Sequence, residues 1–173
     1  MSQLALAERS GLPDALRVLL ADYPRDIWET DPGFDGLIRF WLERHMMFRR
    51  VVTDMQSDAQ KFIDGGFATD QYAARLSRLG GMFVNGLHEH HTIEDTYYFP
   101  KLATKDTRIE GGFAILDKDH HDIDALLNKF VGTANDVLNN RNKKPAMKNV
   151  VGQYETELVI LERLLNRHLN DEE

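Results

Sequence analysis

The sequence contains no cysteine, which excludes disulfides, thiolate zinc sites, iron–sulfur clusters and cysteine nucleophiles. This absence fits a reducing cytoplasm, where we expect the protein to reside. The N-terminal stretch has no basic region and no long apolar run, so we expect neither a signal peptide nor a membrane span. Basic residues are outnumbered, 21 Lys and Arg against 28 Asp and Glu, and the net charge of −7 argues against a nucleic-acid partner.

Apolar residues are plentiful and regularly spaced. The chain has 173 residues and is 42% hydrophobic, enough for one domain with one buried core. Positions alternately four and three apart mark the core-facing side of a helix. Four such stripes are present: Phe34 to Phe62, Tyr72 to Tyr97, Phe113 to Val137, and Met147 to Glu172.

The stripes predict an all-α protein, an up-down-up-down antiparallel four-helix bundle with short connections. Gly65 and Gly66 should end the first helix, Pro100 should kink or end the second, and Pro145 suits the first turn of the fourth. We expect residues 31–173 to form the bundle. Residues 1–30 carry a shorter apolar pattern, which predicts an N-terminal arm or short helix against it.

Polar side chains interrupt each stripe at positions that should face the core. An unpaired buried polar group costs about 1–3 kcal/mol, and a buried charge costs more, so these groups need a shared partner. A pair of metal ions would neutralise the carboxylates and bind the neutral imidazoles. The predicted ligands are His45, His90, Glu94, His120, His168 and Glu172.

The positions of these residues along the helices support one shared site. In an antiparallel bundle, ligands early in one helix meet ligands late in the next, and the four histidines follow this alternation. Glu94 follows His90 by four residues, and Glu172 follows His168 by four, so each pair lies on one helical face. Such a Glu can span two ions, which suits iron or manganese better than one tetrahedral zinc. Glu172 lies at the end of its helix, where helices fray, and we expect metal to order it.

Other residues near the stripes have open alternatives. A single histidine on an apolar stripe is usually a hydrogen-bonded core residue, but four at matching levels favour metal. His91 and His121 each follow a stripe histidine by about 100°, so each either flanks the site or faces solvent. His91 with Asp95, and His121 with Asp124 or Asp117, would be extra or supporting ligand sets. Tyr97, one turn beyond Glu94, is expected to pack in the core with a hydrogen bond rather than bind metal.

These motifs resemble the hemerythrin-like, or HHE cation-binding, domain. The resemblance is carried by His45, by HEHHTIEDTYYFPKL, by LDKDHHDIDALL and by His168-x-x-x-Glu172. It implies a non-haem centre of two iron ions, Fe²⁺ or Fe³⁺, oxo- or hydroxo-bridged in some states, with histidine terminal ligands and two bridging carboxylates. Manganese and zinc stay open. The resemblance also implies binding of dioxygen, nitric oxide, an anion or iron itself, for sensing, carriage or storage.

The chain also departs from the invertebrate oxygen carriers of this family. They have five histidine ligands, two of them four residues apart on the third helix, where Leu116 and Asp124 flank His120 here. They also carry Asp, not Glu, after the last histidine. We therefore favour a sensing or iron-handling protein over an oxygen store. The alternatives are a di-iron oxidase, peroxidase or nitric oxide-handling enzyme, and a metal-free helical bundle that binds a partner protein.

Overall fold

The computed structural model describes residues 4–173, apart from the side chain of Lys144. All the regular secondary structure in this range is helical, which confirms the expectation of an all-α protein. The long ones are α2 (Gly36–Ile63), α3 (Thr69–Ile93), α5 (Glu110–Asn139) and α6 (Lys144–Glu172). Between residues 4 and 173, none of them combines the length and apolar character needed to cross a bilayer.

Two ends of the long helices follow the expected signals, Gly65 and Pro145, and the structure adds a cap at Asp35. Asp35 caps α2, because its carboxylate accepts hydrogen bonds from the backbone N–H groups of Leu37 and Ile38 at 2.9 and 3.1 Å. After α2, Gly65 adopts a φ of 82°, a left-handed conformation that favours glycine. Pro145 lies in the first turn of α6, where a missing N–H costs nothing.

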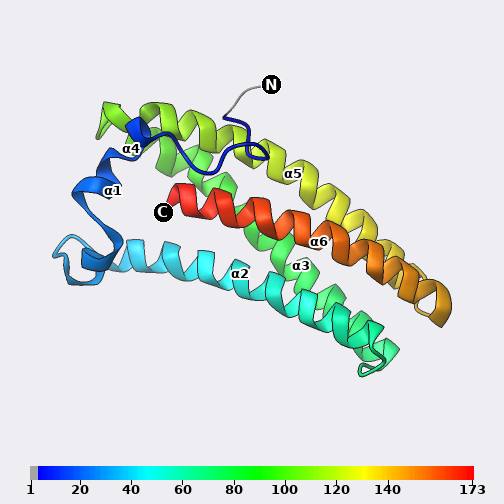
Figure 1. The fold of residues 1–173 in the computed structure, drawn as a ribbon. Coiled ribbons are helices and arrows are strands. Elements are labelled where there is room, and N and C mark those ends of the chain that lie inside the picture. Colours follow the sequence, from blue (N-terminus) through cyan, green and yellow to red (C-terminus); the bar gives the residue numbers. More distant parts are fainter. Residues whose placement is uncertain (1–3) are drawn as a thin grey trace.

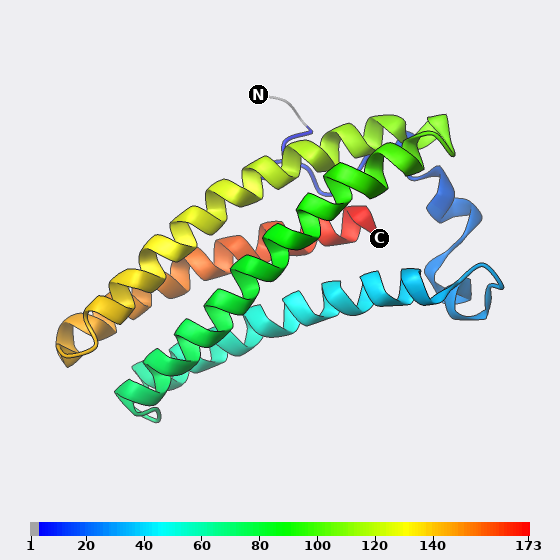
Figure 2. The ribbon, with the colours of Figure 1, turned by 180° about the vertical axis from the view of Figure 1, so that it is seen from behind.

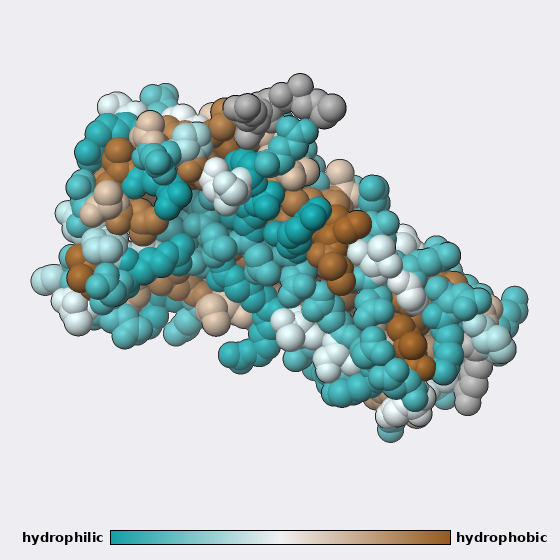
Figure 3. Space-filling view, in the orientation of Figure 1, coloured by the Kyte–Doolittle hydropathy of each residue, from teal (hydrophilic) through white to brown (hydrophobic). Residues whose placement is uncertain are grey.

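The four long helices lie lengthwise beside one another (Figures 1 and 2). Helix α2 packs on α3 and α6, and α5 packs on the same two helices. In Figure 1 the colours advance from left to right along α2 and α5, and from right to left along α3 and α6. Their apolar stripes meet in one core that includes Phe48, Phe83 and Phe130. The face in Figure 3 is mainly hydrophilic, as expected for helices whose apolar residues point inwards.

The helix that begins at Thr69 changes its geometry before Pro100. Regular α3 ends at Ile93, and the chain continues as a π-helical turn, η3 (Glu94–Tyr98), and a short helix, α4 (Phe99–Ala103). The N–H of Phe99 donates to the carbonyl of Glu94, five residues back. Pro100 has no N–H, and its ring clashes with the carbonyl four residues back, so a wider turn relieves the conflict.

This wider turn rotates the following residues away from the expected stripe. Tyr97 is 68% exposed, so the prediction that it packs in the core is wrong. The first stripe also fails at its beginning, because Phe34 precedes α2 and Ile38 is 42% exposed. Both residues instead line a cavity at this end of the molecule, where the neighbouring helices leave α2 uncovered.

The chain before α2 forms short helical turns: η1 (Asp14–Leu16), α1 (Val18–Asp22) and η2 (Arg25–Thr30). Another, η4 (Thr107–Ile109), precedes α5. Leu6 and Leu12 are buried, and Leu6 belongs to the main core. In Figures 1 and 2, residues 18–35 cross from the α4 end of the molecule to the beginning of α2. Residues 1–3 of the expected arm lie outside the described residues.

Candidate metal centre

Five imidazoles and two carboxylates converge at one level of the long helices. Helix α2 contributes one histidine, α3 two adjacent histidines, and η3 one glutamate. Helix α5 contributes one histidine, and α6 a histidine and a glutamate. The π-helical turn begins at Glu94, so the ligand-bearing face of α3 is also where the backbone widens. The residues that meet are His45, His90, His91, Glu94, His120, His168 and Glu172.

These side chains form two groups, each compact enough to hold one ion. Ligand atoms of His91, His120 and His168 lie within 4.8 Å of one another. The second group, with the same limit, combines two histidines with two carboxylates: His45, His90, Glu94 and Glu172. One group of imidazoles beside a second with carboxylates is a donor set for two hard or borderline cations.

Glu172 reaches both groups with different oxygens. Its Oε2 lies 3.4 Å from Nε2 of His45 and 3.9 Å from Nε2 of His90. Its Oε1 lies 3.2 Å from Nε2 of His120 and 2.8 Å from Nε2 of His168. One carboxylate therefore directs an oxygen to each group, as a bridge between two ions requires.

Glu94 is placed in the same way. Its Oε1 lies 3.3 Å from Nε2 of His90, and its Oε2 lies 3.7 Å from Nε2 of His120. Because Glu94 belongs to the chain after α3 and Glu172 to the end of α6, the two carboxylates enter the centre from different helices. Each of the two carboxylates therefore places one oxygen beside each group of histidines.

Three of the histidines also have a carboxylate at Nδ1, on the side away from the centre. The partners are Glu173 for His45 at 3.1 Å, Asp95 for His120 at 2.7 Å, and Asp119 for His168 at 3.3 Å. A carboxylate that accepts from Nδ1–H leaves the lone pair on Nε2, and it makes that nitrogen a better metal ligand. The outer contacts therefore favour the tautomer that points a lone pair into the centre.

Several buried polar atoms at the centre lack a hydrogen-bond partner. They include both ring nitrogens of His91, Nδ1 of His90, and one oxygen each of Glu94 and Glu172. Each such atom costs about 1–3 kcal/mol when buried. Metal ions would bind the carboxylate oxygens and one lone-pair nitrogen of His91, so these residues fit a two-metal group, whereas Nδ1 of His90 lies on the side away from the centre.

Charges at the centre are strongly coupled in the absence of metal. Burial and the nearby charge of Glu172 raise the pKa of Glu94 to about 10, so Glu94 is neutral at pH 7. Burial alone would lower the pKa of His168, but the charge of Glu172 and the hydrogen bond to Asp119 outweigh it and raise the pKa to about 9. Burial lowers the pKa of His90, and it lowers the pKa of His91 well below the ordinary value.

An arginine from the N-terminal segment supports the centre from outside. Nη1 of Arg9 donates to Asp119 at 2.8 Å, Nη2 bonds the other oxygen of Asp119, and Nε donates to Asp171 at 2.9 Å. Asp119 in turn contacts His168, so Arg9 is two contacts from a ligand nitrogen. Burial disfavours the charge on Asp119, but its bonds to Arg9 and His168 prevail and lower its pKa.

The structure brings all six predicted ligands together and adds His91, which the sequence left open between flanking the site and facing solvent. Within residues 4–173, His121, Asp124 and Tyr97 lie outside both ligand groups, and His121 is exposed. Asp95 contacts His120, not His91 as considered from the sequence. One signal could have identified His91: Leu87, His91 and Glu94 also follow four-three spacing.

Comparison with known proteins adds one match. The family model described as the Hemerythrin HHE cation binding domain matches residues 36–173. This range contains every residue of the two ligand groups, and it begins after Arg9 and the short helical turns before α2. A search of curated proteins finds no match. A search of solved structures finds none either.

Proposed function

Because the chain belongs to the hemerythrin HHE cation-binding family, we propose that it holds two iron ions and binds a small ligand at them, for sensing, carriage or storage. His91, His120 and His168 would hold one ion, and His45 and His90 the other. Glu94 and Glu172 would bridge the two. The proposal includes an up-down-up-down antiparallel four-helix bundle over residues 31–173, with residues 1–30 as an arm against it.

The observation that carries this proposal is the placement of the two bridging carboxylates. Glu172 contacts four imidazole Nε2 atoms, two with each oxygen. Glu94 repeats the arrangement with one Nε2 atom for each oxygen. A single ion would use only one side of this arrangement. Two ions would use both sides, and they would bind the carboxylate oxygens and the lone-pair nitrogen of His91 that otherwise lack a partner.

The chain's own residues would control the chemistry of the bound ions. When bound, two ferrous ions with two carboxylates leave a net charge of about +2, which attracts dioxygen-derived or other anionic ligands. Phe48 lies against the ring of His90, with 5.4 Å between centroids, and it belongs with Phe83 and Ile123 to the fully buried core, which would limit the access of water. Asp95, Asp119 and Glu173 orient the imidazoles through Nδ1.

His91 changes the choice among the family's activities. The sequence favours a sensor or iron-handling protein because the third helix lacks one histidine of the oxygen carriers. His91 on α3 brings the number of imidazoles at the centre to five. The histidine that is missing from the third helix therefore no longer argues against reversible dioxygen binding. We keep both dioxygen carriage and sensing in the proposal.

Anaerobic loading with ferrous iron, removal of unbound metal and elemental analysis test the proposal. We expect two irons per chain and, on admission of air, a ligand-to-metal charge-transfer absorption. His91→Ala should reduce the iron content to about one per chain, since it removes one of three imidazoles from its group. His121→Ala, an exposed neighbour of His120, is the matched control and should retain two. Wild-type protein that retains no iron, or equal loss in both variants, would refute the proposal.

A further inference from the structure

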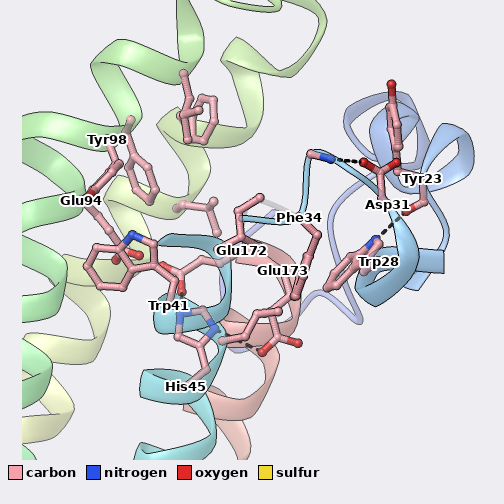
Figure 4. A pocket seen from close by; sticks show the side chains of 17 residues that line it. Tyr23, Trp28, Asp31, Phe34, Trp41, His45, Glu94, Tyr98, Glu172 and Glu173 are labelled. Atoms are coloured by element: carbon pink, nitrogen blue, oxygen red, sulfur yellow. Dashed lines mark hydrogen bonds and ion pairs between the residues drawn. The ribbon is translucent and has the colours of Figure 1, made fainter. Parts of the chain in front are cut away.

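A cavity of about 580 Å³ lies directly against the candidate metal centre. Its inner wall includes His45, Glu94 and Glu172, which belong to the ligand groups. Figure 4 shows these residues on one side, with Trp41 beside them and Phe34 and Trp28 facing them from the chain before α2. The cavity therefore joins the centre to the end of the molecule where α2 begins.

The outer wall of the cavity comes from residues 23–34, before the range that matches the family. This segment has its own internal contacts. The indole N–H of Trp28 donates to the carbonyl of Tyr23 at 2.8 Å, and the carboxylate of Asp31 accepts from the N–H of Gly33 at 2.6 Å. Arg25 fastens the segment to the end of α6 through Glu173 at 2.5 Å. A structured part of this chain thus forms the outer side of the cavity, which stays partly open to solvent.

The size of the cavity exceeds what a diatomic gas needs. One water-sized molecule has a share of about 30 Å³ in the liquid, and this cavity is more than ten times larger. Pockets that enclose organic ligands range over roughly 300–1,000 Å³ and are lined mainly by apolar and aromatic side chains. The walls here fit that description, since Trp28, Phe34, Trp41 and Phe113 all line the space.

The charges of the lining restrict the class of ligand. Its ionisable residues, other than His45 and the two tyrosines, are acidic: Asp31, Glu94, Glu172 and Glu173. Among the residues that the structure describes, no Lys or Arg lines the cavity, so an organic anion finds no cationic side chain on its walls. A cation is not favoured either, because Glu172 already pairs with His168 at 2.8 Å and Glu173 with Arg49 at 2.7 Å. An unpaired buried charge is costly, so the lining favours a ligand without one.

We propose that this cavity binds a neutral, mainly apolar organic molecule, with its inner end at Glu94 and Glu172. The contact of that molecule with metal ions rests on the proposed function. Its binding in the cavity rests on the volume, the aromatic walls and the acidic lining, and it requires no metal.

The two tryptophans of the chain, Trp28 and Trp41, both line the cavity and report directly on its occupancy. The probe is N-phenyl-1-naphthylamine, a neutral apolar fluorophore that accepts energy from tryptophan. It is titrated into the whole protein, first treated with a chelator and then loaded with iron. We expect saturable binding of one probe per chain in both forms, with quenching of the tryptophan emission.

Ile38→Asp tests the location of the bound probe. Ile38 lines the cavity from the first turn of α2, where a carboxylate is compatible with the helix dipole and should not impair folding. A charge there should raise the Kd of the probe at least about tenfold, which corresponds to about 1.4 kcal/mol. Leu37→Asp is the matched control, because Leu37 is 46% exposed in the same turn and lies outside the cavity lining. It should change the Kd less than about twofold.

Each outcome is decisive for the cavity. Binding that does not saturate, or equal weakening by Ile38→Asp and Leu37→Asp, would overturn the inference. The result is separable from the proposed function, which is judged on iron content. Probe binding without iron retention would support the cavity and refute the metal centre, whereas iron retention without probe binding would do the reverse.

Discussion

Replacing Arg9 by Met tests whether the N-terminal segment is part of the metal centre. Arg9 is 4% exposed, and its guanidinium bonds the carboxylates of Asp119 and Asp171. Met has a similar length and is apolar, so it can fill most of the space without a charge. The substitution takes the guanidinium away from two carboxylates, 1% and 7% exposed; Asp119 then keeps His168, and Asp171 keeps the N–H of Leu12.

The size of the effect follows from this burial. Removing one partner of a buried ion pair costs about 3–5 kcal/mol, because the charge left behind is not solvated. For a domain of this length, each kcal/mol lowers the Tm by roughly 2–4 °C, so we expect a decrease of about 10 °C. The affinity for metal should also fall by about 10–100-fold in Asp119→Asn, because His168 loses the carboxylate that orients it.

The assay is urea unfolding of the metal-free protein, followed by a double-mutant cycle with Asp119→Asn. Neutralising Asp119 removes a charge that Arg9→Met leaves unpaired, so the double variant should cost less than the sum of the single ones by at least about 1 kcal/mol. Arg17→Met is the control, because the side chain of Arg17 is 49% exposed and should contribute little. Additive effects, or an equal loss in Arg17→Met, would refute the reasoning.

Three further predictions concern protons, the bridging carboxylate and a turn. Metal uptake at pH 7 should release roughly two protons per chain, from Glu94 and His168, because their pKa values are about 10 and 9 and both groups must lose a proton to bind metal. His90 and His91, whose pKa values are lowered, should release none. Titration with an indicator dye measures the released protons, and metal uptake should weaken as the pH falls. Glu94→Gln should abolish iron retention without weakening the metal-free fold in urea, because the carboxyl is already neutral at pH 7; marked destabilisation would contradict it. Gly65→Ala should cost about 1 kcal/mol in urea unfolding, because φ is 82°, and should leave the iron content unchanged.

The sequence predicts the long helices well because their signals are local. Four-three spacing defines a core-facing stripe within one helix, and residues such as Gly65 and Pro145 define ends through the backbone of their immediate neighbours. The errors occur where the geometry is not that of a regular helix. The π-helical turn before Pro100 rotates Tyr97 to the surface, and a strict 3.6-residue period cannot represent that rotation.

The candidate site is only partly readable from sequence for a related reason. A ligand on the expected stripe can be found from spacing, but His91 lies one position beyond it. A second four-three register includes His91, and its packing against His120 on α5 and His168 on α6 decides between the two. The contact between Arg9 and Asp119 is harder still to predict from the sequence, because these residues are 110 positions apart. Nothing in the local pattern connects a residue before the first long helix with one in the third.

Glu172 shows how the N-terminal segment changes the argument about metal. The sequence suggests that the end of the last helix frays and that bound ions order it. In the structure, Arg9 bonds Asp171 and Arg25 bonds Glu173, so both neighbours of Glu172 are fixed by residues outside the family-matched range. The N–H of Leu12 also donates to Asp171 at 2.9 Å. A bridging carboxylate that is ordered before metal arrives loses less conformational entropy on binding. The segment before α2 should therefore strengthen metal binding at a centre whose ligands it does not supply.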